Sequence, residues 1–390
     1  MSAPFGPTGV TAPRGFRASG VAAGLKGGGG RDVALVVNDG PRAAAAAVFT
    51  SNRVQAAPVL WSRQAVADGR LRAVVLNAGG ANACTGPAGF ADTHRTAEHT
   101  GAAVGVDPGD VAVCSTGLIG ERLPMDALLA GVDAATAALS VDGAADAADA
   151  IRTTDTRSKQ AVVQGDGWTV GGMAKGAGML APGLATMLCV LTTDAVADAA
   201  ALSAVLHDAT RTTFDRIDAD GCMSTNDTVV LLASGASGVT PPPDALATAV
   251  QAVCADLAAQ LLADAEGATK EVRIDVVHAA SEADAVEVGR SIARNNLLKC
   301  ALFGNDPNWG RVLAAVGTTH ARFEPDELDV AINGIEVCRN GAAGDDRGRV
   351  DLTGRDIVIL VDLKAGQRSA TIWTNDLSHA YVEENSAYSS

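Results

Sequence analysis

The chain has 390 residues, of which 47% are hydrophobic and 19% charged, a composition typical of a folded globular protein that argues against intrinsic disorder. Its formal net charge is −15, so its electric field repels phosphate backbones and argues against nucleic acid as a partner. The seven cysteines are scattered without a CxxC pair, which predicts free thiols in a reducing cytoplasm.

The N-terminal segment has no apolar stretch of the kind found in secretion signals, and we expect no apolar run of membrane-spanning length. The six histidines include no HxxxH pair or other metal-ligand spacing. We therefore expect neither a membrane partner nor a metal, and no bound cofactor.

Short β-rich runs alternate with alanine-rich runs of helical period. In chain order, we predict strands at residues 32–37, 45–49, 72–76, 110–114, 186–192, 228–233, 272–278, 357–361 and 370–373. We predict helices at residues 93–101, 125–139, 199–212, 243–265 and 282–295. Strands and helices do not alternate strictly, which favours an α+β fold over a Rossmann sheet. No Gly- or Pro-rich stretch is long enough to separate independent domains.

The segment with the most chemical information is Gly171–Asp194, whose sequence is GGMAKGAGMLAPGLATMLCVLTTD. Its first half reads as a flexible Gly-rich loop, and its second half, from Thr186 on, reads as a buried strand. Thr186 is the last hydroxyl before that strand enters the core. Burying an unpaired hydroxyl costs roughly 1–3 kcal/mol, so a specific role for Thr186 would explain its position.

One such role is self-cleavage at the Ala185–Thr186 bond. The Thr186 hydroxyl attacks the preceding carbonyl in an N→O acyl shift, while Gly183 lets the backbone adopt the strained conformation this requires. The shift frees the α-amine of Thr186, and hydrolysis of the ester then leaves Thr186 as a new N-terminus. The pKa of this amine, about 7.7–8.0, suits a general base for its own hydroxyl. The alternative is an ordinary β-forming Thr with a backbone hydrogen bond.

Several motifs resemble those of the ornithine acetyltransferase family, also called the bifunctional glutamate N-acetyltransferase family. The main one is KGAGMLAPGLATML at Lys175–Leu188, which resembles the family's cleavage site. The others are VFTSNRVQAAPV (48–59), LNAGGANACTG (76–86), STGLIGERLPM (115–125), TTDT (153–156), DADGCMSTNDTV (218–229), EGATK (266–270), GNDPNWGR (304–311) and the terminal YVEENSAYSS. They follow one another in order over most of the chain, so chance similarity is excluded.

The resemblance implies a sheet sandwich flanked by helices, similar to the N-terminal-nucleophile hydrolases. It further implies self-cleavage into an α chain, residues 1–185, and a β chain, residues 186–390, which stay interlocked and assemble as an α2β2 heterotetramer. The implied reaction, in arginine biosynthesis, moves an acetyl group from N2-acetyl-L-ornithine to L-glutamate through an acetyl-Thr186 intermediate. Some family members also accept acetyl-CoA as a co-substrate.

By the same resemblance, Thr186 is the nucleophile, and Thr116 with Gly117 forms the oxyanion hole. The pair follows an apolar strand at a Gly-containing turn, where a hydroxyl and a backbone N–H can point at one carbonyl oxygen. Lys175 would hold a substrate carboxylate or lower the energy of the acyl intermediate. Glu266 would pair with the ammonium group of ornithine; as an acid at the end of a predicted helix it also opposes the helix dipole, a small hint that does not depend on the resemblance.

The remaining substrate contacts implied are Thr153, Asn385 and Ser390. The register of the TTDT motif leaves Thr154 as the alternative to Thr153. Without the resemblance, a tail ending in SAYSS would be read as frayed.

Two other functions remain open at this point. A self-cleaving N-terminal-nucleophile aminopeptidase or amidase would share the threonine chemistry but transfer the acyl group to water. A non-catalytic binding protein could use AGGANACTG as a phosphate-binding loop, although this motif is neither a P-loop nor GxGxxG.

Overall fold

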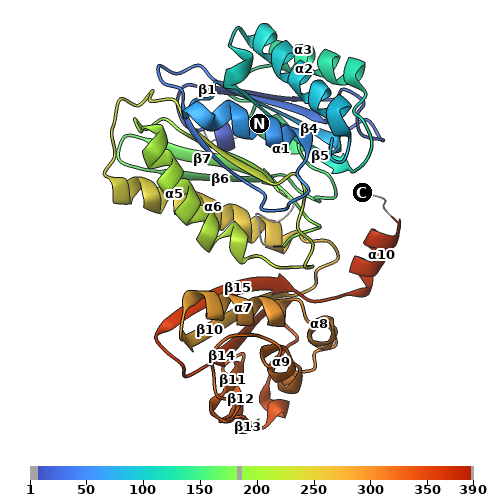
Figure 1. Ribbon diagram of the computed structural model, residues 1–390, viewed down its shortest axis with the longest axis vertical. Coiled ribbons are helices and arrows are strands. Elements are labelled where there is room, and N and C mark those ends of the chain that lie inside the picture. Colours follow the sequence, from blue (N-terminus) through green and yellow to red (C-terminus); the bar gives the residue numbers. More distant parts are fainter. Residues whose placement is uncertain (1–7, 182–186, 388–390) are drawn as a thin grey trace, which may run out of the picture.

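The computed structural model describes residues 8–181 and 187–387. Ala185, Thr186 and Ser390, three of the predicted site residues, lie outside these described residues. Figure 1 shows two parts stacked along the long axis: a layered sandwich, and a C-terminal lobe formed by residues 271–375.

Two sheets form the centre of the sandwich. The four-stranded sheet has the order β1 (Phe16–Val21), β2 (Val33–Asn38), β4 (Ala73–Gly80), β5 (Val111–Leu118). The five-stranded sheet has the order β3 (Ala44–Phe49), β9 (Thr228–Ala233), β8 (Leu188–Thr193), β7 (Thr169–Lys175), β6 (Lys159–Gln164). Val36 and Val74 of the first sheet share one buried hydrophobic cluster with Met173 and Val190 of the second. Burial of both inner faces therefore holds the two sheets together.

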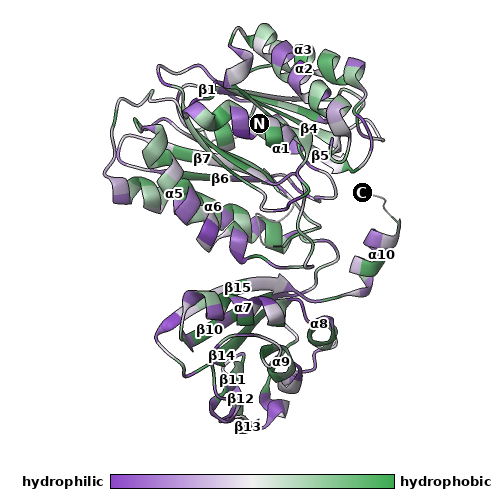
Figure 2. Ribbon diagram, viewed as in Figure 1, coloured by the Kyte–Doolittle hydropathy of each residue, from purple (hydrophilic) through white to green (hydrophobic). Residues whose placement is uncertain are grey.

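Helices cover the outer faces of both sheets (Figure 1). Those packing on the four-stranded sheet are α1 (Ala57–Ala65), α2 (Gly86–Val104) and α3 (Met125–Ala137), while α4 (Ala144–Ala150) packs along β1. Those packing on the five-stranded sheet are α5 (Ala199–Thr212) and α6 (Pro243–Ala263). Figure 2 shows hydrophobic residues following the strands and hydrophilic ones gathering on the helices and loops. The α–β–β–α layering confirms the predicted α+β sandwich flanked by helices.

The C-terminal lobe has a separate hydrophobic core. Its six-stranded sheet has the order β13 (Ala342–Ala343), β12 (Ile335–Arg339), β11 (Asp329–Ile332), β14 (Asp356–Asp362), β10 (Glu271–Ala279), β15 (Arg368–Asn375). Helices α7 (Glu282–Ala293), α8 (Asn296–Phe303) and α9 (Trp309–Val316) accompany this sheet, and α10 (His379–Ala387) follows β15. Two cores within one chain were not expected, because no long linker marks their border.

Most predicted elements are confirmed, and two of them, α5 and β9, have the predicted boundaries. The expectation of a loop at residues 171–175 is wrong, because these residues belong to strand β7 and are buried. Gly171 and Gly172 serve close packing there: a Cβ on Gly171 would lie 2.0 Å from the carbonyl oxygen of Gly9, and one on Gly172 would lie 2.7 Å from Leu191 Cδ2. Glycine inside a strand thus marks a close approach and not a loop.

Helix α6 corrects another expectation, because its 21 residues are long and apolar enough to span a membrane by length and composition. Half of its most apolar window is buried inside the protein. Leu246, Val250, Val253 and Leu257 pack in the cluster beneath the five-stranded sheet. The apolar character of α6 is therefore explained by its place as a core helix.

Candidate active site

A pocket opens where strands β5 and β7 end, between the sandwich, the turn after α6 and helix α10. Its volume is about 140 Å³, which suits a small metabolite. The lining residues are Ala81, Thr116, Gly117, Ile119, Thr153, Thr154, Lys175, Gly178, Met179, Asp220, Cys222, Ser224, Thr225, Asn226, Glu266, Tyr381 and Asn385. All predicted site residues within the described ranges are among them.

Thr116 and Gly117 form one wall of the pocket, as predicted. They lie in the last part of strand β5, and Thr116 is buried with only 5% of its surface exposed. Gly117 has a φ of +128°, and a Cβ there would lie 2.6 Å from the backbone nitrogen of Gly80. Only glycine fits this position, which leaves the backbone at the end of β5 open toward the pocket.

Lys175 is the last residue of β7 and is only 2% exposed, which corrects the expectation of a lysine on a loop. Its Nζ donates a hydrogen bond of 3.2 Å to Thr116 Oγ1. Burial lowers the pKa of Lys175, while the nearby Asp155, Asp227 and Glu266 raise it. The structure therefore places a buried lysine amine, with acidic groups nearby, beside the predicted oxyanion hole.

Glu266 joins three segments of the pocket. One carboxylate oxygen accepts from Thr154 Oγ1 at 2.6 Å and the other from Asn385 Nδ2 at 2.9 Å. Its backbone N–H donates to the carbonyl of Ala177 at 2.9 Å. Because α6 ends at Ala263, Glu266 lies in the following turn, and the sequence argument from the helix dipole was wrong.

The two threonines of the TTDT motif both line the pocket but differ in their contacts. The backbone N–H of Thr153 donates to Asp155 Oδ2 at 3.0 Å, while the Thr154 hydroxyl bonds to Glu266. Thr153 keeps its side chain available for a ligand, and Thr154 supports the carboxylate.

The C-terminal segment reaches the pocket as an ordered helix. Asn385 lies on α10, which extends to Ala387, so the reading of a frayed tail does not hold for this part of it. Tyr381, on the same helix, also lines the pocket, and burial raises the pKa of its hydroxyl to about 12. Sequence reasoning missed Tyr381, although the motif YVEENSAYSS contains it.

The loop before β9 supplies a further wall that sequence reasoning did not assign. Asn226 Nδ2 donates to the carbonyl of Ala81 at 2.6 Å and to that of Ser115 at 2.8 Å. Asp220 accepts from the backbone N–H of Leu180 at 3.2 Å. Polar side chains of this loop bind backbone groups of three other segments. The many polar residues in DADGCMSTND were therefore the sequence feature that could have predicted its place in the site.

Asp227 forms a hydrogen bond with Met187, the first residue after the predicted cleavage point that the structure describes. Its Oδ1 accepts from the backbone N–H of Met187 at 3.1 Å. Asp227 is fully buried, and this burial raises the pKa of its carboxyl group well above the ordinary value. The strand that begins after residue 186 is thus tied to the loop that walls the pocket.

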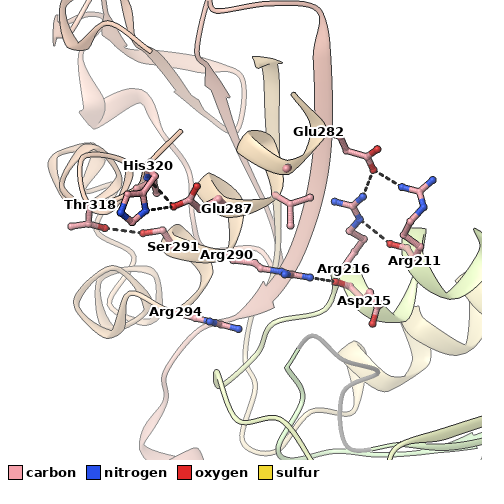
Figure 3. Close-up of a pocket in the computed structure, with 13 residues that line it drawn as sticks. Arg211, Asp215, Arg216, Glu282, Glu287, Arg290, Ser291, Arg294, Thr318 and His320 are labelled. Atoms are coloured by element: carbon pink, nitrogen blue, oxygen red, sulfur yellow. Dashed lines mark hydrogen bonds and ion pairs between the residues drawn. The ribbon is translucent and has the colours of Figure 1, made fainter. Parts of the chain in front are cut away.

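A second hollow, of about 640 Å³, lies between the end of α5 and helices α7 and α9 (Figure 3). Arg211 and Arg216 both pair with Glu282, and Arg294 Nε contacts Asp218 Oδ2 at 2.7 Å. These arginines neutralise the acids around them, so the hollow is an ion-paired junction that joins the C-terminal lobe to the sandwich. Within residues 8–181 and 187–387, no group of three His, Cys, Asp or Glu is arranged to hold a metal ion.

The chain is similar to known proteins over almost its whole length. The sequence model of the ArgJ family matches residues 17–390. The arginine biosynthesis bifunctional protein ArgJ of Thermobifida fusca is 67% identical, with 97% of this chain and 99% of that protein covered. The protein of the same name from Mycobacterium leprae is 60% identical, with 98% and 96% covered.

Among solved structures, the chain is similar to an ornithine acetyltransferase from Mycobacterium tuberculosis complexed with ornithine. The identity is 59% and the TM-score 0.45, with 46% of this chain and 96% of that chain covered. The full-length sequence matches confirm the resemblance found in the motifs: the chain belongs to the ArgJ family.

Proposed function

We propose that this chain transfers the acetyl group of N2-acetyl-L-ornithine to L-glutamate in arginine biosynthesis. The observation that carries the proposal is the convergence of Thr116, Gly117, Lys175, Glu266 and Asn385 on one small pocket. These residues come from four separate motifs. The relatives that cover almost the whole chain are named as arginine biosynthesis enzymes.

The pocket offers a group for each part of the substrate. The Thr116 hydroxyl and the Gly117 N–H can stabilise the oxyanion of the acetyl carbonyl, and one such donor is typically worth about 2.7–4 kcal/mol of barrier. Lys175 supplies a positive charge for a carboxylate, and Glu266 supplies a negative charge for the side-chain ammonium of ornithine. Thr153 and Asn385 complete the substrate contacts, with Ser390 as a further contact from the tail.

The nucleophile in this proposal is Thr186, freed by cleavage of the Ala185–Thr186 bond. Its hydroxyl attacks the acetyl carbonyl, its own α-amine takes the proton, and ornithine leaves with that proton on its amino group. Glutamate then attacks the acetyl ester through its α-amine and restores the threonine hydroxyl. Transfer to glutamate wins over hydrolysis because the small pocket orients the incoming amine and limits access of water.

The strand order supports two interlocked halves after cleavage. In the five-stranded sheet, β7 from the first half pairs with β8 from the second, and β3 pairs with β9. Residues 1–185, the α chain, and 186–390, the β chain, would therefore stay associated through shared sheet hydrogen bonds. Two such pairs would make the α2β2 heterotetramer implied by the family resemblance, which light scattering of the purified protein tests.

Acetyl-CoA is a further donor in this proposal, and no other cofactor is required. The cysteines among the described residues are all free thiols, and a cytoplasmic location is proposed from this and from the biosynthetic role of the relatives.

Intact-mass measurement and N-terminal sequencing of the purified protein test the cleavage, with two fragments and a new Thr186 terminus as the expected result. Turnover of acetylornithine is then measured with and without glutamate. Ornithine release that depends on glutamate supports the transferase. Release that ignores glutamate would favour the aminopeptidase or amidase alternative, and one intact inactive chain would favour a binding protein.

A further inference from the structure

Beneath the pocket lies a network of charged side chains with almost no exposed surface. Lys159, on strand β6, is 0% exposed, and its Nζ contacts Asp155 and Asp264 at 2.6 Å each. Asp155 is 4% exposed and Asp264 9%. Asp155 belongs to the TTDT motif, but no role has been assigned to it, and the proposed reaction uses neither Lys159 nor Asp264. Burying charged groups is costly, so a specific role would explain their position.

Asp155 occupies the branching point of this network. Its Oδ1 accepts from Lys159 Nζ and also from the backbone N–H of Gly176 at 2.7 Å. Its Oδ2 accepts from the backbone N–H of Thr153 at 3.0 Å. One carboxylate thus fixes the residue next to Lys175 and the residue proposed to contact substrate.

Among the acids near Lys175, Asp155 also has the strongest electrostatic effect on its pKa. Burial lowers the pKa of Lys175, and Asp155 is the strongest of the groups that raise it, ahead of Asp227 and Glu266. Lys159 acts in the opposite direction. In turn, Asp155 has a pKa of about 2, with Lys175 and Lys159 as the main groups that lower it against burial.

Asp264 shares Lys159 with Asp155 but is not among the residues that line the pocket. Its other contacts are the backbone N–H of Thr156, at 3.1 Å, and the Thr156 hydroxyl. It therefore offers a buried carboxylate of the same network that has no contact with the backbone around Lys175.

We propose that Asp155 is a positioning residue, which holds Lys175 and the Thr153 segment in the pocket by bonding Gly176, Thr153 and Lys159 at once. The inference rests on the proposed function for its kinetic readout. Lys175 remains the group that touches substrate, and Asp155 acts only through it and through the Thr153 segment.

Asp155→Asn is the main test, read as the pH dependence of kcat/KM for acetylornithine. Activity that needs protonated Lys175 falls as the pH rises through the pKa of Lys175. Loss of a neighbouring opposite charge shifts a pKa by about 1–3 units, so the basic limb should move to lower pH by that amount. KM for both carboxylate substrates should rise more than kcat falls.

Two matched variants separate positioning from general damage. Asp264→Asn removes a carboxylate from the same network, and its basic limb should stay at the wild-type pH. Lys159→Gln removes the charge that opposes protonation of Lys175, and its limb should move to higher pH. Equal shifts for Asp155→Asn and Asp264→Asn would overturn the inference, as would a slower Asp155→Asn enzyme with an unmoved limb. If Asp155→Asn does not fold, the Lys159→Gln variant decides. A basic limb of Lys159→Gln that stays at the wild-type pH or moves to lower pH would also overturn the inference.

A measurement independent of turnover keeps this inference distinct from the proposed function. NMR of protein carrying ¹³C-labelled lysine, with Lys175→Met to assign the signal, reports the titration of Lys175 directly. Asp155→Asn should lower its midpoint, and an unchanged midpoint would contradict the inference. If wild-type protein does not turn over acetylornithine, the proposed function fails, while the NMR titration still decides the role of Asp155.

Discussion

Glu266 is held from two sides, because each of its carboxylate oxygens accepts a side-chain hydrogen bond from a distant segment. Gly178 makes room for it, since a Cβ on that glycine would lie 2.4 Å from Glu266 Oε2. The carboxylate is therefore fixed in place before a substrate arrives, which lowers the cost of binding a cation.

Replacing Glu266 by Gln should weaken recognition of the ornithine ammonium and leave self-cleavage intact. A hydrogen bond to a charged group contributes about 1.5–3 kcal/mol, so kcat/KM for acetylornithine should fall about 10- to 100-fold. Steady-state kinetics and a denaturing gel measure the two effects. Glu383→Gln, an exposed acid on α10, is the matched control. An unchanged kcat/KM for Glu266→Gln would remove Glu266 from the site.

Replacing Thr186 by Ala should abolish both cleavage and turnover, because alanine has no hydroxyl for the acyl shift or the acetyl ester. Thr186→Ser, which keeps the hydroxyl, should retain cleavage at a reduced rate. Mass spectrometry and the acetylornithine assay on the same preparations check both. An alanine variant that still splits and turns over would identify another nucleophile.

At the residue scale, the sequence predicted which side chains meet but not how they are held. Thr116, Lys175, Glu266 and Asn385 were found through motifs and lie in one pocket. The burial of Lys175 depends on the pairing of β7 with β6 and β8, which local sequence does not specify. Asp155 was missed although it belongs to the TTDT motif, because the fold alone brings it to Lys159 and to the backbone of Gly176.

Strand β7 was not predicted, because the glycines that its close packing requires are unusual in strands. Its glycines lower β-propensity, so the sequence reads as a loop. In the structure, the same glycines admit the Gly9 backbone on one side and Leu191 on the other. Strands β8 and β9 were predicted more easily, because their β-branched and apolar residues are buried on both faces.

Gly171→Ala should therefore destabilise the protein, since the added Cβ would meet the Gly9 carbonyl oxygen at 2.0 Å. Overpacking of this kind typically costs about 1–3 kcal/mol. Urea unfolding of the uncleaved Thr186→Ala background measures the loss as a lower midpoint. Gly30→Ala, at a loop position with open space around the added Cβ, should leave the midpoint within error. Equal midpoints for the two variants would contradict this account of β7.

At the scale of the whole molecule, ion pairs of the arginine-rich junction in Figure 3 join the sandwich to the C-terminal lobe, which has a hydrophobic core of its own. Asp218, which pairs with Arg294 there, begins the loop that walls the candidate active site. Burial raises the pKa of Asp218 to about 6. The sequence did not reveal this division, because only the short segment 264–270 separates α6 from β10.

The raised pKa of Asp218 predicts a pH-dependent stability. The folded protein binds a proton at Asp218 up to a pH of about 6, whereas an unfolded chain releases it near 3.8, the ordinary value. The stabilising contribution is complete below 3.8 and is lost as the pH rises through 6, by at most about 1.4 kcal/mol per pH unit.

Asp218→Asn should remove this contribution, so that its free energy of unfolding falls less steeply between pH 4 and 6 than that of the parent. Urea unfolding in the uncleaved Thr186→Ala background measures both slopes, with the exposed Asp256→Asn as the control. Parallel curves for Asp218→Asn and its parent would show that Asp218 does not titrate in this range.

The interleaving of strands from both sides of residue 186 has a consequence for the life of the enzyme. The uncut chain folds by a first-order process, since β3, β6 and β7 are covalently tethered to β8 and β9. Once the bond is cut, the same sheet can be rebuilt only by an encounter of two separate polypeptides. Recovery from denaturation then becomes second-order, and dilution slows it. The proposed cleavage would therefore turn a precursor that can refold on its own into an enzyme that stays active only while its two chains remain assembled.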